Sequence, residues 1–146
     1  MKIKVQIDPA YLEPEVHILA AEITDEIQAL VQRLSEKRPS ALVCYDRDSA
    51  VLVEQEQLIR VYASRQKVYA QTTAGEYLLR RRLYELEEML DAKAFVRISN
   101  AEIVNLHFVE RLDLSITGTI GMRLKNGETS YVSRRYVNHI KTILGI

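Results

Sequence analysis

The sequence contains no tryptophan, only one cysteine and no long apolar run. Because a single cysteine has no partner in its own chain, an intrachain disulfide is excluded, and Cys44 lies in the apolar run 41–45, where a small buried residue is expected. No apolar stretch approaches the ~20 residues that a membrane-spanning helix needs. The first five residues alternate charged and apolar side chains, unlike the apolar core of a signal peptide. The sequence therefore predicts a cytoplasmic protein.

The sequence also lacks the motifs of common enzyme classes. Its three histidines, His17, His107 and His139, are far apart and lack the spacing of metal ligands. The segment 118–121 has two glycines but not the Lys-Ser/Thr pair of a phosphate-binding loop, and the sequence has no Gly-x-Ser-x-Gly elbow. We therefore expect no catalytic residues, no metal site, no cofactor and no small-molecule substrate.

A net charge of zero conceals an uneven distribution along the chain. Residues 1–60 hold 7 Lys and Arg against 11 Asp and Glu, whereas residues 61–146 hold 13 against 9. An acidic front and a basic back are typical of a chain that binds nucleic acid with one half. An imbalance of this size also arises by chance, so the charges alone support both interpretations equally.

The first forty residues predict a small α/β extension. Residues 2–7 and 16–21 are expected to form short strands, and Thr24 is a suitable N-cap for a helix that continues to about Lys37. The apolar stripe of this helix consists of Ile27, Leu30, Val31 and Leu34. Forty residues are too few for a secure independent core, so the stripe is expected to pack within the chain or on a second copy. Residues 1–40 would then serve as a dimerisation or regulatory piece.

Residues 41–146 predict a mostly antiparallel β domain with one short helix, which places the chain in the α+β class. The strand candidates are 42–45, 50–53, 58–63, 67–72 and 77–79, with further strands around residues 96–98 and 103–106. Short strands separated by polar turns are typical of antiparallel sheets. The helix, residues 81–90, carries Leu83, Leu86 and Leu90 toward the sheet and Glu85, Glu87 and Glu88 toward solvent.

The last third of the chain has a clear period of two. Between residues 114 and 124, apolar side chains occupy positions 114, 116, 120, 122 and 124, which predicts one strand with a buried face. Asn126-Gly127 predicts a tight type I′ turn, after which residues 129–132 pair back. Basic and amide side chains follow this hairpin, while residues 137–144 keep a helical apolar spacing. The hairpin thus presents a basic edge that is suited to a polyanion.

Four blocks in this region resemble the C-terminal half of LytTR-type DNA-binding domains. They are Phe95-Val-Arg-Ile-Ser-Asn-Ala-Glu-Ile-Val-Asn105, Thr117-Gly118-Thr119, Lys125-Asn126-Gly127 and Val132-Ser-Arg-Arg-Tyr-Val137. The order and spacing of the blocks match, and the resemblance extends upstream to about residue 42. It implies a domain at residues 41–146 in which loop side chains read the bases. The extension at residues 1–40 is too short for the receiver domain that often precedes such domains.

The resemblance also implies roles for individual residues. By position, the expected base-reading residues are Gln66, Asn100 and Arg135, and the expected phosphate contacts are Lys67, Arg97, Ser99, Arg134, Asn138 and Lys141. The implied function is a sequence-specific transcription regulator that binds paired repeats in duplex DNA as a homodimer. The resemblance permits an inhibitory membrane protein as a partner. The alternative is a protein-interaction module whose acidic N-terminal part binds another protein, and a steep salt dependence would favour DNA.

Overall fold

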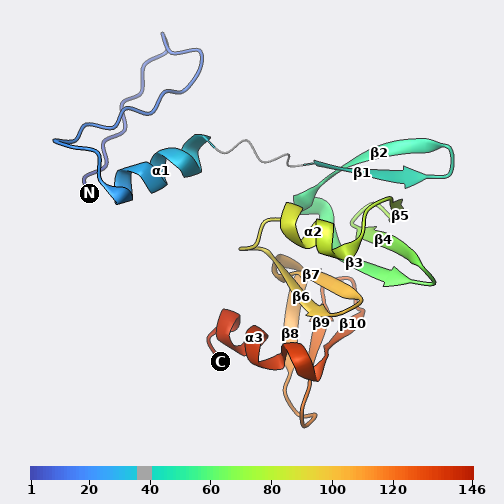
Figure 1. The fold of residues 1–146 in the computed structure, drawn as a ribbon. Coiled ribbons are helices and arrows are strands. Elements are labelled where there is room, and N and C mark those ends of the chain that lie inside the picture. Colours follow the sequence, from blue (N-terminus) through green and yellow to red (C-terminus); the bar gives the residue numbers. More distant parts are fainter. Residues whose placement is uncertain (36–40) are drawn as a thin grey trace. The chain divides into compact units, whose positions relative to one another are not determined.

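The chain divides into two units, Met1–Arg38 and Pro39–Ile146. The computed structural model describes residues 1–35 and 41–146 (Figure 1). The predicted helix end near Lys37 and the domain boundary expected after residue 40 lie outside the described residues.

The first unit contains one helix, α1 (Asp25–Ser35). Thr24 Oγ1 accepts a hydrogen bond from Ile27 N at 3.3 Å, and acidic side chains occupy the first turn, so the predicted cap and helix are confirmed. The strands expected at 2–7 and 16–21 are wrong, because residues 1–24 contain no strand. An isolated pair of strands is marginally stable without a third strand or a packed helix, and α1 itself contains no buried residue.

The larger sheet of the second unit has seven strands in the order β2-β1-β5-β4-β3-β7-β6. The strands are β1 (Ala41–Asp46), β2 (Ser49–Glu54), β3 (Leu58–Ser64), β4 (Lys67–Thr72), β5 (Glu76–Leu79), β6 (Phe95–Ser99) and β7 (Glu102–Asn105). Every neighbouring pair is antiparallel. The prediction of an antiparallel β domain is therefore confirmed.

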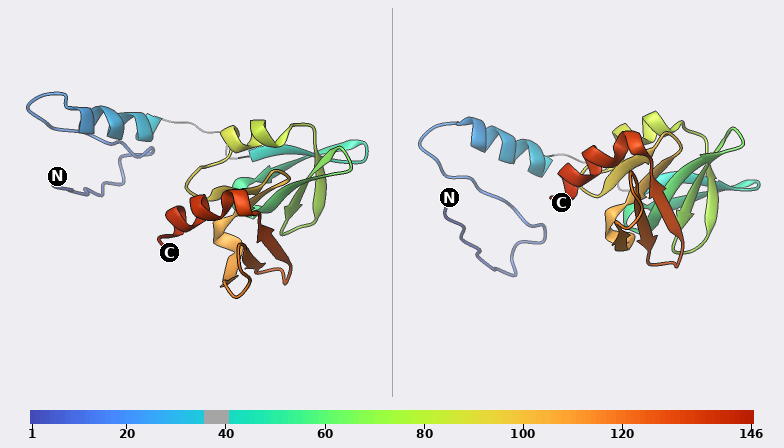
Figure 2. Two further views of the ribbon diagram at one scale, coloured as in Figure 1. Left: turned by 60° about the horizontal axis from the view of Figure 1, so that its bottom comes forward. Right: turned by 90° about the horizontal axis from the view of Figure 1, so that it is seen from below.

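A smaller sheet and two helices complete the second unit. The sheet has the order β10-β9-β8, with β8 (Val109–Asp113), β9 (Ile120–Leu124) and β10 (Thr129–Val132). The helices are α2 (Leu83–Met89) and α3 (Arg134–Leu144), with 3₁₀ turns at Gln55–Gln57 and Leu106–Phe108. The unit thus has two α-helices where one was expected, and the second is the segment with helical apolar spacing. Helix α3 packs on β6 beside the smaller sheet (Figure 2).

The β6–β7 hairpin separates two hydrophobic cores. Phe95 and Ile103 face the first core together with the buried leucines 83, 86 and 90, as predicted for α2. Val96, Ile98 and Val104 face the second core, which also contains apolar residues of β9, β10 and α3. Because alternate strand residues point to opposite faces, one hairpin serves as a wall of both cores. Cys44 is fully buried in the first core, and burial raises the pKa of its thiol to about 11.

The single strand predicted for residues 114–124 is wrong, since β8 ends at Asp113 and β9 begins at Ile120. The side chain of Asp113 accepts a hydrogen bond from Ser115 N at 2.9 Å, which closes a local turn. Gly118 then adopts a positive φ of +82°, a conformation that a regular strand does not contain. Leu114 and Ile116 are consequently 59% and 47% exposed, although their spacing matched a buried face.

The predicted type I′ turn at Asn126-Gly127 is also wrong. Gly127 N donates to Leu124 O at 2.9 Å and Leu124 N donates to Glu128 O at 2.8 Å, so the loop between β9 and β10 has three residues. Within it only Gly127 has a positive φ, at +90°, as in a three-residue hairpin loop with a left-handed last position. The turn with two positive φ angles lies between β3 and β4, at Arg65 (50°) and Gln66 (65°).

Candidate nucleic-acid interface

Two hairpin turns leave the seven-stranded sheet at the same end. Strands β3 and β7 are antiparallel with Tyr62 opposite Glu102, and Ala63 N donates to Ala101 O at 2.8 Å. The β3–β4 turn therefore lies beside the β6–β7 turn, on the order of 10 Å away because neighbouring strands are ~4.8 Å apart. These turns carry Gln66 and Asn100, and both side chains are exposed.

The first turn of α3 joins the same end of the sheet. Ser133, which directly precedes α3, donates its backbone N–H to Ile98 O in β6 at 2.9 Å. The Tyr136 hydroxyl donates to Asn100 Oδ1 at 3.3 Å, so the helix contacts the β6–β7 turn directly. Arg135 lies between these two contacts in the sequence and is exposed. The fold thus brings together the elements that carry all three expected base-reading residues.

One face of α3 is polar and exposed along its length. Arg134, Asn138 and Lys141 follow one another at spacings of four and three, which places them on one side of the helix. On another side of the helix, Ile140 is buried in the second core, and Val137 and Leu144 pack against it. An added Cβ at Gly118 would lie 3.4 Å from Arg134 Nε, so the 114–119 loop contacts this arginine at a residue without a side chain.

The charge at the start of α3 is unusual for a helix. Its first turn contains Arg134 and Arg135 and no acidic residue. Cations near a helix N-terminus oppose the helix dipole, at a cost of ~0.3–1 kcal/mol each. Neither arginine has an ion pair with an acidic residue of the described chain. A bound phosphate would offset the repulsion between the arginines and the helix dipole, and it would supply the opposite charge that the two arginines lack. The electrostatics of this turn therefore favour an anionic ligand.

Arg97 differs from the other expected phosphate contacts because its guanidinium group is already bound. It donates from Nε to Ser99 O, from Nη2 to Asn100 O and from Nη1 to Glu87 Oε2, each at 2.7 Å, and its side chain is only 14% exposed. Arg97 therefore clamps the backbone of the turn that carries Asn100 to helix α2. Glu87, which was expected only to face solvent, provides the acidic end of this clamp.

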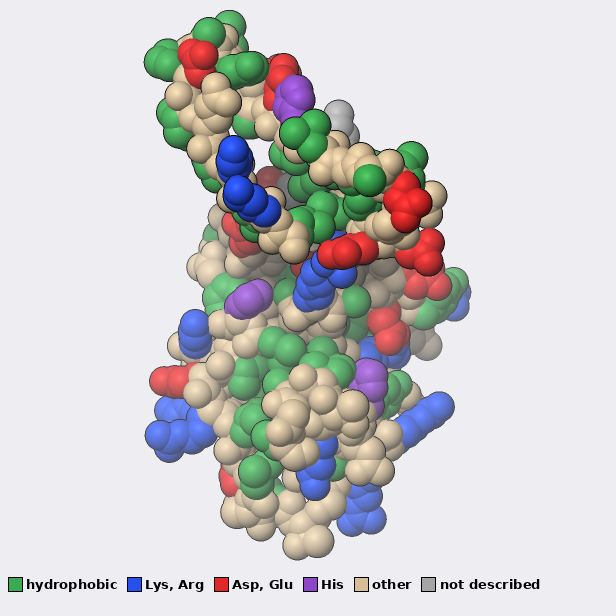
Figure 3. Space-filling view, turned by 90° about the vertical axis from the view of Figure 1, so that its left-hand side faces the viewer, with side chains coloured by type: hydrophobic (Ala, Val, Ile, Leu, Met, Phe, Trp, Pro, Cys, Tyr) green, Lys and Arg blue, Asp and Glu red, His purple; other side chains and the backbone are tan. Residues whose placement is uncertain are grey.

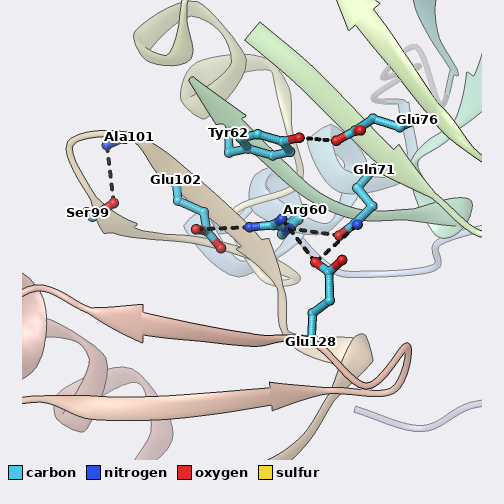
Figure 4. A network of polar contacts seen from close by, with 8 residues as sticks. All are labelled: Arg60, Tyr62, Gln71, Glu76, Ser99, Ala101, Glu102 and Glu128. Atoms are coloured by element: carbon cyan, nitrogen blue, oxygen red, sulfur yellow. Dashed lines mark hydrogen bonds and ion pairs between the residues drawn. The ribbon is translucent and has the colours of Figure 1, made fainter. Parts of the chain in front are cut away.

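The turn that carries Asn100 also contains an internal hydrogen bond. Ala101 N donates to Ser99 Oγ at 3.2 Å, as Figure 4 shows. Ser99 is half-buried, so its hydroxyl proton is still available to an incoming phosphate oxygen.

The conformation of the β3–β4 turn is set by its backbone, because Arg65 and Gln66 both adopt the left-handed conformation that non-glycine residues rarely occupy. Lys67 begins β4 immediately after this turn and is exposed.

A polar network fixes the smaller sheet to the larger one. Arg60 on β3 donates to Gln71 at 2.7 Å, to Glu102 at 3.3 Å and to Glu128 in the β9–β10 turn at 3.0 Å (Figure 4). Gln71 Nε2 also donates to Glu128 Oε2 at 3.2 Å. Because α3 continues directly from β10, this network helps to set the position of α3 relative to the two turns.

The sequence reasoning missed the residues that support the interface. Tyr136 lies inside the block Val132–Val137 that carries the family resemblance, so its position could have drawn attention to it. Arg60, Glu87 and Glu128 carry no such signal, since their partners are distant in sequence and belong to other elements. Their roles depend on pairings that appear only in the folded chain.

The described residues were also compared with the requirements of a metal site and of a membrane-spanning helix. No group of His, Cys, Asp and Glu in residues 1–35 and 41–146 is arranged to hold a metal ion. No helix within those ranges is long and apolar enough to cross a membrane. The expectation that the protein has no catalytic residues stays a prediction.

Comparisons with known proteins agree with this architecture. A family model described as the LytTr DNA-binding domain matches residues 48–145. Two proteins of Staphylococcus aureus, from strains MSSA476 and MW2, are named uncharacterized HTH-type transcriptional regulators; each is 33% identical over 147 residues, covering 100% of this chain and 99% of the relative. The fold is similar, with a TM-score of 0.71 and 22% identity, to the LytTr DNA-binding domain of a methyl-accepting/DNA response regulator from Bacillus cereus, covering 73% of this chain and 98% of that one.

Proposed function

The chain belongs to the LytTR family of DNA-binding domains, and on this premise we propose that it is a transcription regulator that binds specific sequences in duplex DNA. The observation that carries the proposal is the convergence of the β3–β4 turn, the β6–β7 turn and the start of α3 at one end of the sheet. We call these two turns, together with the start and the polar face of α3, the reading end. It consists of residues 64–67, 99–101 and 133–141.

Within the reading end, we assign base reading to Gln66, Asn100 and Arg135. A guanidinium group pairs with the two acceptors of guanine, and a side-chain amide pairs with adenine. The phosphate contacts we propose are Lys67, Ser99, Arg134, Asn138 and Lys141, which lie in or directly beside the three elements. Phosphate contacts set the register of the protein on DNA, and base contacts supply the specificity.

Arg97 was expected to contact phosphate, but its hydrogen bonds support a positioning role. Two of them hold the carbonyl groups of Ser99 and Asn100, and the third is to Glu87. With these three hydrogen bonds made and only 14% of its side chain exposed, Arg97 has little donor surface left for a phosphate. We therefore propose that Arg97 fixes the β6–β7 turn so that Asn100 is presented to the DNA in one orientation.

The assembly that we propose is a cytoplasmic homodimer on paired repeats. A two-fold dimer presents two reading ends, which suits two copies of one DNA sequence. Residues 1–40 would form the dimerisation or regulatory extension, and residues 41–146 the DNA-binding domain. An inhibitory membrane protein that binds the extension is suggested by the family resemblance alone. No catalytic step and no cofactor is part of this proposal.

The protein-interaction module remains the competing function, and the exposed apolar residues of the N-terminal unit favour a protein contact there. Salt dependence separates the two functions. Phosphate contacts release counterions, so DNA affinity falls steeply with ionic strength, whereas an apolar protein contact changes little.

The test begins with the selection of bound sequences from a random duplex pool. On the selected site, Asn100→Ala and Arg135→Ala should each cost ~1–3 kcal/mol, with little effect on random DNA. Lys141→Ala should weaken both DNAs equally and lower the salt slope by about one unit. Arg123→Ala removes an exposed arginine from β9, outside the reading end, and serves as the control. Failure to enrich any sequence, or an equal loss on both DNAs for Arg135→Ala, would contradict the proposal.

A further inference from the structure

Three consecutive arginines, residues 80–82, connect β5 to α2, and we call them the β5–α2 junction. The junction is anchored on both sides, because Leu79 before it and Leu83 after it are buried in the first core. Strand β5 pairs with β4 so that Leu79 lies opposite Val68. The junction therefore leaves the sheet at the same end as the β3–β4 turn, about one strand spacing, ~4.8 Å, from the start of β4.

The junction extends the row of elements that make up the reading end. Starting from it, the strand order is β5-β4-β3-β7-β6, and α3 packs on β6. The turns that carry Gln66 and Asn100 lie within this row, which measures about 20 Å from β5 to β6 at ~4.8 Å per strand. One helical turn of DNA is ~34 Å long, so a duplex that lies along the row reaches the junction as well as α3.

The residues assigned to phosphate so far lie mostly on one side of this row. Arg134, Asn138 and Lys141 all belong to α3. In Figure 3 basic side chains predominate over acidic ones in the lower part of the view, at the height where Figure 1 shows α3. On the other side of the row, beyond Gln66, only Lys67 has been assigned. The junction adds positive charge on that side.

Arg80 combines a fixed position with unused hydrogen-bond donors. Its Cζ lies 3.8 Å from the centroid of the Tyr45 ring on β1, and the residue is exposed. Stacking occupies the face of the guanidinium group and leaves the N–H groups at its edge available. Within residues 1–35 and 41–146, Arg80 has no hydrogen-bond or ion-pair partner. Arg60 also stacks on a tyrosine, Tyr62, but its side chain is only 18% exposed and donates to three partners.

The Arg80–Tyr45 stack lies on the face of the sheet that also carries α3. Tyr45 is opposite Leu78, and cross-strand pairs continue this face through β4 and β3 to Glu102 on β7. Val104, two residues after Glu102, points to the same side and is buried in the second core, on which α3 packs. A duplex at this end of the sheet can therefore meet Arg80 and α3 from one side.

We propose that Arg80 contacts a DNA phosphate at the side of the interface opposite α3, and that Tyr45 positions it. The planar guanidinium group pairs with two phosphate oxygens at once, and a fixed guanidinium loses little freedom on binding. Arg81 and Arg82 add positive charge beside it, since the exposed ion pair of Arg81 with Glu85, at 3.6 Å, contributes little. The inference rests on the proposed function and extends its interface from the reading end to β5.

The test measures the affinity of the full chain for two duplexes over a range of salt concentrations. One duplex is the site selected from the random pool, and the other is a random duplex of equal length. Arg80→Ala should weaken binding to both by roughly fivefold to tenfold at low salt and lower the salt slope by about one unit. Arg123→Ala, which removes an exposed arginine from β9, is the matched control and should leave the slope unchanged.

The positioning role of Tyr45 is tested through Arg80. Tyr45→Leu removes the ring, so affinity should fall by about twofold to fivefold, as expected for loss of an exposed cation–π contact. Tyr45→Phe keeps the ring and should restore the affinity. In an Arg80→Ala background, Tyr45→Leu should have no further effect, whereas damage to the fold would lower affinity in both backgrounds.

Three results would overturn the inference, and they differ in what they say of the proposed function. An unchanged salt slope in Arg80→Ala, with specific binding still lost in Arg135→Ala, would remove the phosphate contact and leave the proposed function intact. Equal losses from Tyr45→Leu with and without Arg80 would show that Tyr45 does not act through Arg80. A wild-type protein that binds neither duplex would overturn the proposed function and this inference together.

Discussion

The β3–β4 turn and the β6–β7 turn leave the same end of the sheet but hold their exposed side chains in different ways. The first relies on its backbone, because Arg65 and Gln66 adopt φ angles of 50° and 65°. The second relies on other elements, because Arg97 binds the backbone of Asn100 and Tyr136 binds its side chain. One turn is positioned locally, and the other is positioned by side chains from its own strand, α2 and α3.

This difference predicts which mutations affect each turn. Unfavourable backbone conformations cost ~1–3 kcal/mol per residue and persist only where the surrounding structure imposes them. For Gln66 that structure is the closing pair Ser64 and Lys67. For Asn100 that structure includes Glu87 on α2. Glu87 binds Arg97 and lies ten residues before it in the sequence. Substitutions outside the turn should therefore disturb base reading by Asn100 and leave Gln66 unaffected.

The largest effect is expected for Arg97→Ala. Loss of three hydrogen bonds should lower the free energy of unfolding by ~1–3 kcal/mol, as measured by urea denaturation. Affinity for the selected DNA site should fall more than affinity for random DNA, because Asn100 is no longer held in one orientation. The salt slope should stay unchanged, since a positioning residue releases no counterion.

Arg97→Lys sharpens this test because it keeps the charge and removes the planar group that binds three partners. A phosphate contact would tolerate lysine, whereas a positioning residue would not. Full specific affinity in Arg97→Lys, together with a lower salt slope in Arg97→Ala, would restore the phosphate role first expected for this residue.

In a third turn, between β9 and β10, the residue with a positive φ is a glycine, which adopts this conformation without strain. Gly127 has a φ of +90° and nothing lies within 4 Å of an added Cβ, so Gly127→Val tests backbone conformation alone. We expect a loss of ~1–3 kcal/mol in unfolding free energy and weaker specific binding, because Glu128 would shift relative to Arg60. Gly127→Asn, which tolerates the left-handed region better, should cost less. Equal stability of the valine variant and wild type would contradict the prediction.

Tyr136→Phe should have a smaller effect that is confined to the β6–β7 turn. It removes only the hydroxyl group that binds Asn100 Oδ1, a contact of ~0.5–1.5 kcal/mol. In a binding assay with single-base variants of the DNA site, discrimination at the base assigned to Asn100 should decrease. Discrimination at the base assigned to Gln66 should not change. A uniform loss at all positions would show that Tyr136 supports the whole interface.

The smallest change in stability is expected for Gln66→Gly. Glycine adopts a positive φ without strain, so the protein should gain up to about 1 kcal/mol while it loses the side chain to which we assign base reading. Gln66→Ala removes most of the same side chain but keeps the strained backbone. The difference between the two melting temperatures therefore reports the strain, and no difference would mean that the turn stores none.

The sequence predicted those features that local pattern determines. Short apolar runs between polar turns located the strands of the large sheet, and three leucines located the buried face of α2. Apolar alternation alone misplaced residues 114–119, because it continued through Leu114 and Ile116 while Asp113 and Gly118 set the local conformation. The order of the resembling blocks led to the base-reading assignment of Asn100 and Arg135, which stays a prediction. The role of Arg97 could not be predicted, because its acceptors are two backbone carbonyls and a glutamate on another element.

The order of the reading-end elements along the chain has a consequence for synthesis of the protein. Its three parts come from separate stretches of the chain, and the last of them, α3, follows all ten strands. A chain emerging from the ribosome can complete the seven-stranded sheet once β7 is released, with Gln66 and Asn100 already exposed. It still lacks Arg134 and Arg135 at that stage. On the proposed assignment, DNA binding therefore requires the final helix, so an unfinished chain should not occupy the DNA sites.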